Sequence, residues 1–209
     1  MNDQEHLNYP AQLEPIQAET KALGFGLASD FLTGSLLRTL VAAKPAGSFL
    51  ELGTGTGVAT AWMLDGMDEE SRLISIEQDR AVLAIAVKHL GSDSRVSFHH
   101  EDAGVWLGRA EPAQFDLIFA DTWPGKYHQL EDALRLLRRG GLYVLDDMLP
   151  QPNWPEGHAA KVSDLIARLE QRAELVLTKM NWATGMIVAT KPASGTRRRK
   201  GSPVLYPPP

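Results

Sequence analysis

The sequence predicts an α/β fold in which a mostly parallel sheet carries helices on both faces. Short apolar runs alternate with stretches whose apolar residues recur at helical spacing, and this alternation indicates repeated strand–helix–strand units. A glycine-rich turn, ELGTGTG at 51–57, joins the first apolar run to the first of these helices. Crossovers of this kind are right-handed and produce parallel sheets that are buried on both faces.

Five apolar runs are predicted as buried strands, and several of them end in an acidic residue. These runs are 48–53, 72–77, 96–101, 115–121 and 142–147. Between them, apolar residues at helical spacing predict further elements. These are helices at 58–67, 80–90 and 128–139.

The C-terminal part of the fold is predicted from two further features. A proline-rich loop at 150–155 is followed by a helical pattern at about 156–171. The strand-like runs 174–180 and 185–191 come next and are separated only by NWAT. So short a connection predicts an antiparallel hairpin, which we expect at the edge of the sheet.

The chain is expected to have three parts: a helical segment at 1–45, the α/β domain at 46–191, and a tail at 192–209. The clearest N-terminal helix is SDFLTGSLLRTLVAAK, which Ser29 or Asp30 could cap. The composition of the tail predicts disorder. Its basic run Arg197–Lys200 could bind a polyanion, although a solvated terminus is the favoured interpretation.

Composition restricts the class of protein. A chain of 209 residues can bury one core, and a net charge of −5 does not favour binding to nucleic acid or to an anionic membrane. Cysteine is absent, which excludes disulfides, thiolate metal sites and cysteine nucleophiles. No signal peptide and no membrane-spanning apolar run is recognised. The expectation is a soluble, cytoplasmic protein.

The glycine-rich turn predicts a site for a nucleoside. Glycines let the backbone turn sharply and let a ligand approach the main chain, and the following helix offers free N–H groups. The dinucleotide fingerprint has glycines at its first, third and sixth positions. Here Gly53 and Gly55 match, but Val58 occupies the sixth position and Gly57 precedes it. This departure favours a nucleoside ligand other than NAD.

Four acids are expected at the carboxyl ends of parallel strands, which is where open α/β sheets bind ligands. Glu77, 20 residues after Gly57, can accept hydrogen bonds from both hydroxyls of a ribose. Asp102 could address an adenine edge, and Glu51 and Asp121 complete the set. Any one of them could simply cap a helix. Four acids in register with a glycine-rich turn favour a binding site.

These residues together resemble the class I S-adenosylmethionine (SAM)-dependent methyltransferases, and more narrowly the bacterial O-methyltransferases related to catechol O-methyltransferase. The resemblance covers about residues 20 to 191 and rests on ordered motifs. They are ELGTGTG, ISIEQD, HHEDAGVWL, FDLIFADTWPGKY, LLRRGGLYVLDDMLP and NWATGMIVATK. It implies a Rossmann-like, seven-stranded, mostly parallel sheet whose last strand is antiparallel, and O-methylation of a small hydroxylated acceptor.

The resemblance also implies roles for individual residues. The methionine part of SAM would lie against the glycine-rich turn, the ribose against the end of the second strand, and the adenine beside the residues after the third. The implied cofactor-binding residues are Glu51, Gly53, Thr54, Gly55, Gly57, Glu77, Gln78, Asp102, Ala103 and Asp121. Relatives are often dimers through their N-terminal helices, so a homodimer is an open expectation.

Aromatic residues in or near the expected acceptor loops suit a flat aromatic acceptor, although loop packing is an alternative explanation. They are Trp123, Tyr127, Trp154 and Trp182.

Metal-dependent relatives bind Mg²⁺ through an aspartate after the fourth strand and an Asp-Asn pair after the fifth. The corresponding residues here are Asp121, Asp146 and Asp147, so an aspartate replaces the asparagine. Three oxygen ligands suit Mg²⁺, Ca²⁺ or Mn²⁺. The family's lysine, three residues after the first aspartate, is replaced by Pro124, and Lys126 follows two residues later.

The catalytic residues predicted from this comparison are Asp121, Lys126 and Asp146. Three interpretations of the carboxylates stay open: a divalent metal site, metal-free base catalysis, and a structural pair. Clustered carboxylates without an ion repel, and one of them would then take up a proton and could act as the base. His158 and His128 are alternative bases.

Three other functions remain as alternatives. The basic tail motivates an RNA methyltransferase. An NAD-linked dehydrogenase is disfavoured by Val58 at the small-residue position. A non-catalytic nucleoside-binding protein is motivated by the missing lysine.

Overall fold

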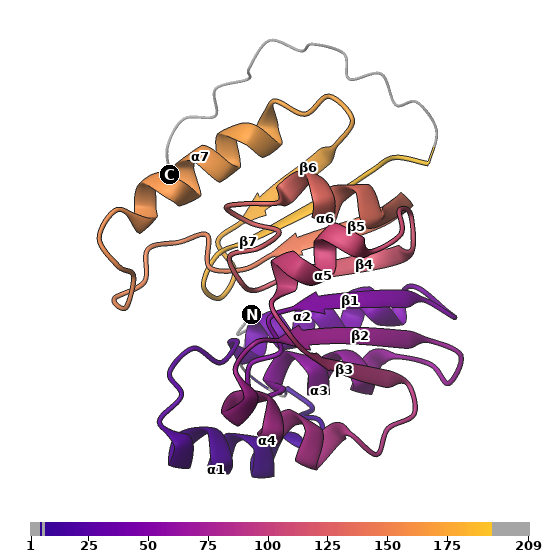
Figure 1. The fold of residues 1–209 in the computed structure, drawn as a ribbon, viewed down its shortest axis with the longest axis vertical. Helices are drawn as coiled ribbons and strands as arrows, with labels where there is room; N and C mark the ends of the chain where they lie inside the picture. The colour runs from indigo at the N-terminus through magenta and orange to yellow at the C-terminus, as the bar shows by residue number, and fades with distance from the viewer. Residues whose placement is uncertain (1–4, 6, 194–209) are drawn as a thin grey trace.

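The protein forms one seven-stranded sheet with helices on both faces (Figure 1), as seen in a computed structural model that describes Glu5 and residues 7–193. The strand order is β3-β2-β1-β4-β5-β7-β6. The strands are β1 (Ser48–Leu52), β2 (Arg72–Glu77), β3 (Val96–His100), β4 (Phe115–Ala120), β5 (Leu137–Leu145), β6 (Val176–Met180) and β7 (Met186–Thr190).

Strands β1 to β5 are mutually parallel, whereas β7 runs antiparallel to both β5 and β6. The predicted α/β fold, with its mostly parallel sheet and antiparallel last strand, is therefore confirmed, and so is the C-terminal hairpin. The topology switches direction at β1, whose two neighbours are β2 and β4. Open sheets bind ligands beyond the carboxyl ends of strands at such a point.

Two helical layers cover the sheet. Residues of α1 to α4 share one apolar core with one face of the sheet, and residues of α5 to α7 share a second core with the other face (Figure 1). The helices are α1 (Leu13–Leu23), α2 (Phe31–Ala42), α3 (Val58–Gly66), α4 (Arg80–Leu90), α5 (Ala103–Arg109), α6 (Leu130–Leu136) and α7 (His158–Glu170).

Alternation along the central strands explains how one sheet supports both cores. In β4, Leu117 and Phe119 face the layer of α1 to α4, whereas Ile118 and Ala120 face the opposite layer. Successive side chains of a strand point to opposite faces, so a strand buried on both sides consists of continuous apolar residues. This is the physical reason that the apolar runs could be recognised in the sequence.

The N-terminal helices belong to the same core as α3 and α4. Leu13 and Ile16 of α1 are buried there together with Leu37 and Val41 of α2. Helix α2 begins after Asp30, whose carboxylate accepts a hydrogen bond of 2.7 Å from the backbone N–H of Leu32. Of the two caps proposed from the sequence, Asp30 is therefore the one used.

The largest error in the predicted boundaries lies between α6 and β5, since the strand was expected only from residue 142. The helix expected at 128–139 ends at Leu136, and β5 begins at Leu137. Leu137 pairs with Phe115 of β4, and the register then shifts before Leu117 pairs with Leu142. Gly140, with φ 77°, allows this irregularity. These residues form a strand despite their helical spacing, because the strand pairing gives hydrogen-bond partners to backbone groups at the start of β4.

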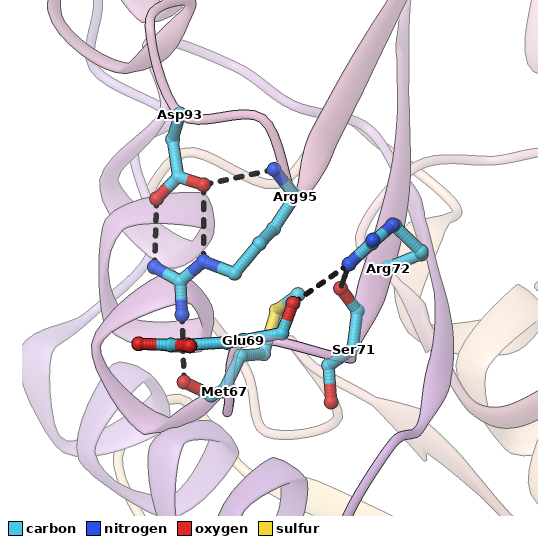
Figure 2. A network of polar contacts seen from close by, with 6 residues as sticks. All are labelled: Met67, Glu69, Ser71, Arg72, Asp93 and Arg95. Carbon is cyan, nitrogen blue, oxygen red and sulfur yellow. Dashed lines mark hydrogen bonds and ion pairs between the residues drawn. The ribbon is translucent and has the colours of Figure 1, made fainter.

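A network of polar contacts lies at the amino-terminal ends of β2 and β3 (Figure 2). The guanidinium of Arg95 contacts both carboxylate oxygens of Asp93, at 3.0 and 2.7 Å, and donates to the carbonyl of Met67. Arg72, the first residue of β2, donates to the carbonyls of Glu69 and Ser71. This network fixes the ends of β2 and β3 that lie away from the strand-end acids.

Among the helices in the described part of the chain, none has the length and apolar character that crossing a membrane requires. The basic run Arg197–Lys200 lies outside the described residues.

Candidate functional site

The carboxyl edge of the sheet carries two adjoining cavities. The first, which we call the turn cavity, has a volume of about 240 Å³. Its walls are the glycine-rich turn, the residues after β2, and the segment that joins α1 to α2. They comprise Phe25, Leu27, Ala28, Ser29, Gly53, Thr54, Gly55, Thr56, Val58, Glu77, Gln78, Asp79, Asp121 and Thr122.

The glycines of the turn are required by its geometry. Gly53, Gly55 and Gly57 have φ values of 95°, 55° and 92°. A Cβ atom on Gly53 would lie 2.9 Å from the carbonyl oxygen of Asp121, and one on Gly57 would lie 2.8 Å from Cβ of Ala86. Side chains at these two positions are excluded both by the backbone conformation and by the space available. Gly53 and Gly55 therefore offer bare backbone to the cavity, whereas Gly57 does not line it and faces α4.

Glu77 is oriented by the turn. Its Oε2 accepts a hydrogen bond of 3.0 Å from the N–H of Gly55, and its Oε1 accepts one of 2.9 Å from the N–H of Asp79. An ionised carboxylate has about four lone-pair positions, so each oxygen keeps capacity for a further donor. Glu77 thus presents a pre-oriented acceptor to any ligand that carries two neighbouring hydroxyls.

A narrow recess extends the turn cavity past Glu77 and Gln78 to Asp102 and Ala103. Asp102 caps α5, because its Oδ1 accepts a hydrogen bond of 2.9 Å from the N–H of Val105. The cap interpretation that was weighed for the strand-end acids is correct for this residue. Capping engages one carboxylate oxygen and leaves Asp102 at the wall of the recess.

Glu51 lies beneath the turn and, like Gly57, lines neither cavity. It is fully buried, and its Oε2 accepts hydrogen bonds from the hydroxyls of Thr60 and Ser75, at 2.6 and 2.5 Å. Ser75 in turn contacts the hydroxyl of Thr54 in the turn. The geometry makes Glu51 a support of the turn.

Burial raises the pKa of Glu51 to about 7 from an ordinary 4.5. Between pH 4.5 and 7, Glu51 is therefore protonated in the native state and ionised in the unfolded chain. Its contribution to the free energy of unfolding is complete below pH 4.5 and is lost as the pH rises through 7. We expect Glu51→Gln, which cannot ionise, to gain stability over the parent by up to about 3 kcal/mol at pH 9 and little at pH 4.5.

Urea unfolding from pH 4.5 to 9 measures this difference. The exposed Glu70→Gln controls for the loss of one surface charge. A stability difference that stays constant across this range would contradict the shifted titration of Glu51.

The second cavity, which we call the aspartate cavity, has a volume of about 480 Å³ and adjoins the turn cavity. Both cavities share one wall, made of Leu27, Ala28, Ser29, Asp121 and Thr122. The remaining walls are Gly26, Asp30, Trp123, Lys126, Tyr127, Asp146, Asp147, Gln151, Asn153, Trp154, Pro155, His158 and Thr184.

Three of the four aromatic residues singled out from the sequence line the aspartate cavity. Trp123, Tyr127 and Trp154 surround the imidazole of His158, with ring centroids 5.9, 5.0 and 4.7 Å away. Trp182 does not line it, because its indole N–H donates to the carbonyl of Leu32 at 2.9 Å.

Asp121 lies at the junction of the two cavities. Its Oδ2 accepts a hydrogen bond of 2.9 Å from Ser29, and its Oδ1 lies 3.7 Å from the ammonium of Lys126. Burial raises the pKa of Asp121 well above its usual value, and the positive charge of Lys126 opposes this rise. Lys126 is itself buried and donates to the backbone carbonyl of Asp146 at 2.8 Å.

Asp146 and Asp147 follow β5 and have different surroundings. Oδ1 of Asp146 accepts hydrogen bonds from the hydroxyl of Thr184 and from the N–H of Asp147. Burial raises the pKa of Asp146. Asp147 is half-buried and has a left-handed backbone, with φ 61°. Among the described residues, no group of three acidic, histidine or cysteine side chains is arranged to hold a metal ion.

The donor set of the aspartate cavity therefore does not fit a divalent metal. Among the described residues, the three carboxylates predicted as ligands form no group that could hold a metal ion, and Lys126 already supplies a buried positive charge beside Asp121. A divalent ion requires several oxygen ligands directed at one point.

His158 and His128 have different positions. Nε2 of His158 lies 3.0 Å from the hydroxyl of Tyr127 inside the aspartate cavity. Burial lowers the pKa of His158, which favours the neutral imidazole, and raises that of Tyr127 to about 12. His128 faces a separate groove, together with Lys161 and Arg168. Of the two, only His158 is placed to exchange a proton with a molecule in the aspartate cavity.

Two polar residues that donate hydrogen bonds to the aspartates of the site were not predicted as site residues. Ser29 was considered only as a helix cap, and its hydroxyl donates to Asp121. Thr184, in the turn between β6 and β7, donates to Asp146. Both are distant in sequence from their partners, so spacing carried no signal for either contact.

Comparison with known proteins gives a consistent result. Residues 50–148 match a family described as a methyltransferase domain. The chain is 31% identical over 128 residues to a putative O-methyltransferase of Mycolicibacterium vanbaalenii, covering 59% of this chain and 56% of the relative. It is 33% identical over 123 residues to a catechol O-methyltransferase of Niastella koreensis, covering 56% of each. The matches thus span little more than half of these relatives.

Solved structures match over more of the chain. A putative O-methyltransferase from Klebsiella pneumoniae is 26% identical with a TM-score of 0.75, covering 88% of this chain and 90% of that one. The O-methyltransferase TomG from Streptomyces achromogenes, solved in complex with SAM, is 23% identical with a TM-score of 0.78, covering 91% and 93%.

Proposed function

We propose that this protein transfers the methyl group of SAM to an oxygen atom of a small hydroxylated acceptor, since residues 50–148 match a methyltransferase domain and the fold matches solved O-methyltransferases. The arrangement of the two cavities carries the proposal. They share a wall at Ser29, Asp121 and Thr122. A donor in one cavity and an acceptor in the other would meet at this wall.

SAM fits the turn cavity by its chemistry. The backbone of the glycine-rich turn would accommodate the methionine part, and Glu77 would accept the ribose hydroxyls. The adenine would extend into the recess beside Gln78, Asp102 and Ala103. The bound group supplies an activated methyl on a sulfonium. The protein supplies position, and holding donor and acceptor in line can accelerate such a reaction by several orders of magnitude.

An aromatic acceptor suits the aspartate cavity, which has Trp123, Tyr127 and Trp154 in its walls. The acceptor hydroxyl must lose its proton as the new C–O bond forms. Two groups of this cavity can receive it, the carboxylate of Asp121 and the neutral imidazole of His158. The buried ammonium of Lys126 would stabilise negative charge on the acceptor oxygen.

Titration calorimetry with SAM and S-adenosylhomocysteine tests the proposal, and we expect one molecule of either to bind per chain. Transfer of an isotope-labelled methyl group is then measured over a panel of catechols and other phenols. Absence of binding by both nucleosides would refute the proposal. Binding without transfer to any acceptor would favour the nucleoside-binding alternative, and binding of NADH instead would favour the dehydrogenase.

Several expectations from the sequence stay predictions. They are the cytoplasmic location, a homodimer through the N-terminal helices, and the absence of a nucleic-acid partner.

A further inference from the structure

We propose that the ammonium of Lys126 is the built-in cation of the aspartate cavity and takes the place of a divalent metal, so that methyl transfer needs no metal ion. The inference rests on the proposed function for its catalytic meaning. Its structural basis is independent of the reaction, because it concerns a buried positive charge among carboxylates. Lys126 is 3% exposed, which is rare for a lysine.

The partners of Lys126 are those that a cation requires. Its Nζ lies 3.7 Å from Oδ1 of Asp121 and donates to the carbonyl oxygen of Asp146 at 2.8 Å. A buried ammonium is retained only where opposite charge and hydrogen-bond acceptors replace water. The strand-end acids provide both. A divalent ion in the same place would face this fixed positive charge at short range.

The carboxylates are also committed to other donors. Asp121 accepts from Ser29 through Oδ2, and Asp146 accepts from Thr184 and from its neighbour's backbone through Oδ1. These hydrogen bonds engage one oxygen of each carboxylate and leave Oδ1 of Asp121 facing Lys126. In the described part of the chain they form no three-membered ligand group with Asp147.

The local backbone explains how Lys126 reaches this position. The N–H groups of Lys126 and Tyr127 both donate to the carbonyl of Trp123, which closes a tight turn after β4. Gly125 has φ 88° within it, and its carbonyl accepts a hydrogen bond of 2.6 Å from the buried hydroxyl of Tyr143. This hydrogen bond attaches the turn to β5, and the side chain of Lys126 points into the protein. The turn thus positions the ammonium of Lys126.

The consequence is a site whose electrostatics are fixed by the fold. A metal ion would stabilise an acceptor oxygen only when bound, whereas Lys126 is part of the chain. It can interact with the developing oxyanion without a ligand-binding step. Turnover is therefore expected to be insensitive to chelators and to added Mg²⁺.

Binding of Mn²⁺ alone, followed by electron paramagnetic resonance, tests the proposal without SAM or acceptor. We expect no stoichiometric binding by the parent at about 1 mM Mn²⁺. Lys126→Met keeps the apolar stem and removes the charge, so it should gain Mn²⁺ affinity by at least about tenfold, and a further Asp121→Asn should abolish the gain. Lys161→Met, outside the aspartate cavity, is the matched control and should gain nothing.

The proposal would be overturned if the parent bound Mn²⁺ stoichiometrically and Asp146→Asn lost that binding. It would also be overturned if Lys126→Met folded but gained no affinity for Mn²⁺. Circular dichroism decides whether that variant is folded. If it is not, the parent decides alone: equal turnover in EDTA and in Mg²⁺ supports the proposal, and loss of turnover in EDTA that Mg²⁺ restores overturns it. Failure of the proposed function leaves the Mn²⁺ result unaffected.

Discussion

Replacing Glu77 by alanine should weaken SAM binding by about 100-fold while the protein stays folded. Each hydrogen bond to a charged carboxylate is worth about 1.5–3 kcal/mol, so the loss of two ribose contacts reaches this factor even when part is recovered by water. The carboxylate of Glu77 also accepts hydrogen bonds from the N–H groups of Gly55 in the turn and of Asp79. Calorimetry with S-adenosylhomocysteine, which carries the same ribose, measures the loss.

Two variants separate the ribose contact from a general effect of charge. Glu77→Gln keeps one acceptor oxygen and should lose less affinity than the alanine variant. Glu101→Ala removes the acid directly after β3, which pairs with Arg109 and lines neither the turn cavity nor its recess. It should bind like the parent. Equal affinity of Glu77→Ala and the parent would show that the ribose assignment is wrong.

The fold was predictable because its strands are buried on both faces. Leu117, Ile118 and Phe119 are apolar in succession since each contacts one of two cores, and no loop requires such a run. The end of α6 was not predictable. Leu137 continues the helical spacing of Leu130 and Leu134, and only its pairing with Phe115 assigns it to a strand.

The site was predictable where it depends on position along a strand. The ends of parallel strands meet at one edge, so Glu77, Asp121 and Asp146 could be placed together from the sequence. Their hydrogen-bond partners could not be inferred in this way. The contact of Thr184 with Asp146 is made across 38 residues, and that of Ser29 with Asp121 across 92.

Lys126 illustrates the same limit. Spacing placed Pro124 where relatives carry a lysine, and this left the role of Lys126 open. The tight turn at Trp123 to Tyr127 shortens the path of the chain and brings the ammonium next to Asp121. The number of residues between Asp121 and Lys126 does not predict the distance between their side chains, because Gly125, with positive φ, turns the chain between them.

Gly57→Ala should be strongly destabilising, lowering the free energy of unfolding by about 3–5 kcal/mol. Its φ of 92° is rarely adopted by residues with a side chain, and the new Cβ would lie 2.8 Å from Cβ of Ala86 in α4. Gly55→Ala is the matched control. Its φ is 55° and its nearest neighbour, the ring of Phe25, lies 3.4 Å away, so we expect about 1 kcal/mol.

A double-mutant cycle with Ala86→Gly divides the cost of Gly57→Ala into its two causes. Ala86→Gly alone should lower stability by about 1 kcal/mol, because glycine is unfavourable within a helix. It also removes the atom closest to the new Cβ, so the double variant should be more stable than the sum of the single changes by about 1 kcal/mol or more. Strict additivity in urea unfolding would assign the whole cost to the backbone conformation. The coupled result would mean that Gly57 is required because α4 packs directly on the turn, which ties the shape of the turn cavity to the helical layer behind it.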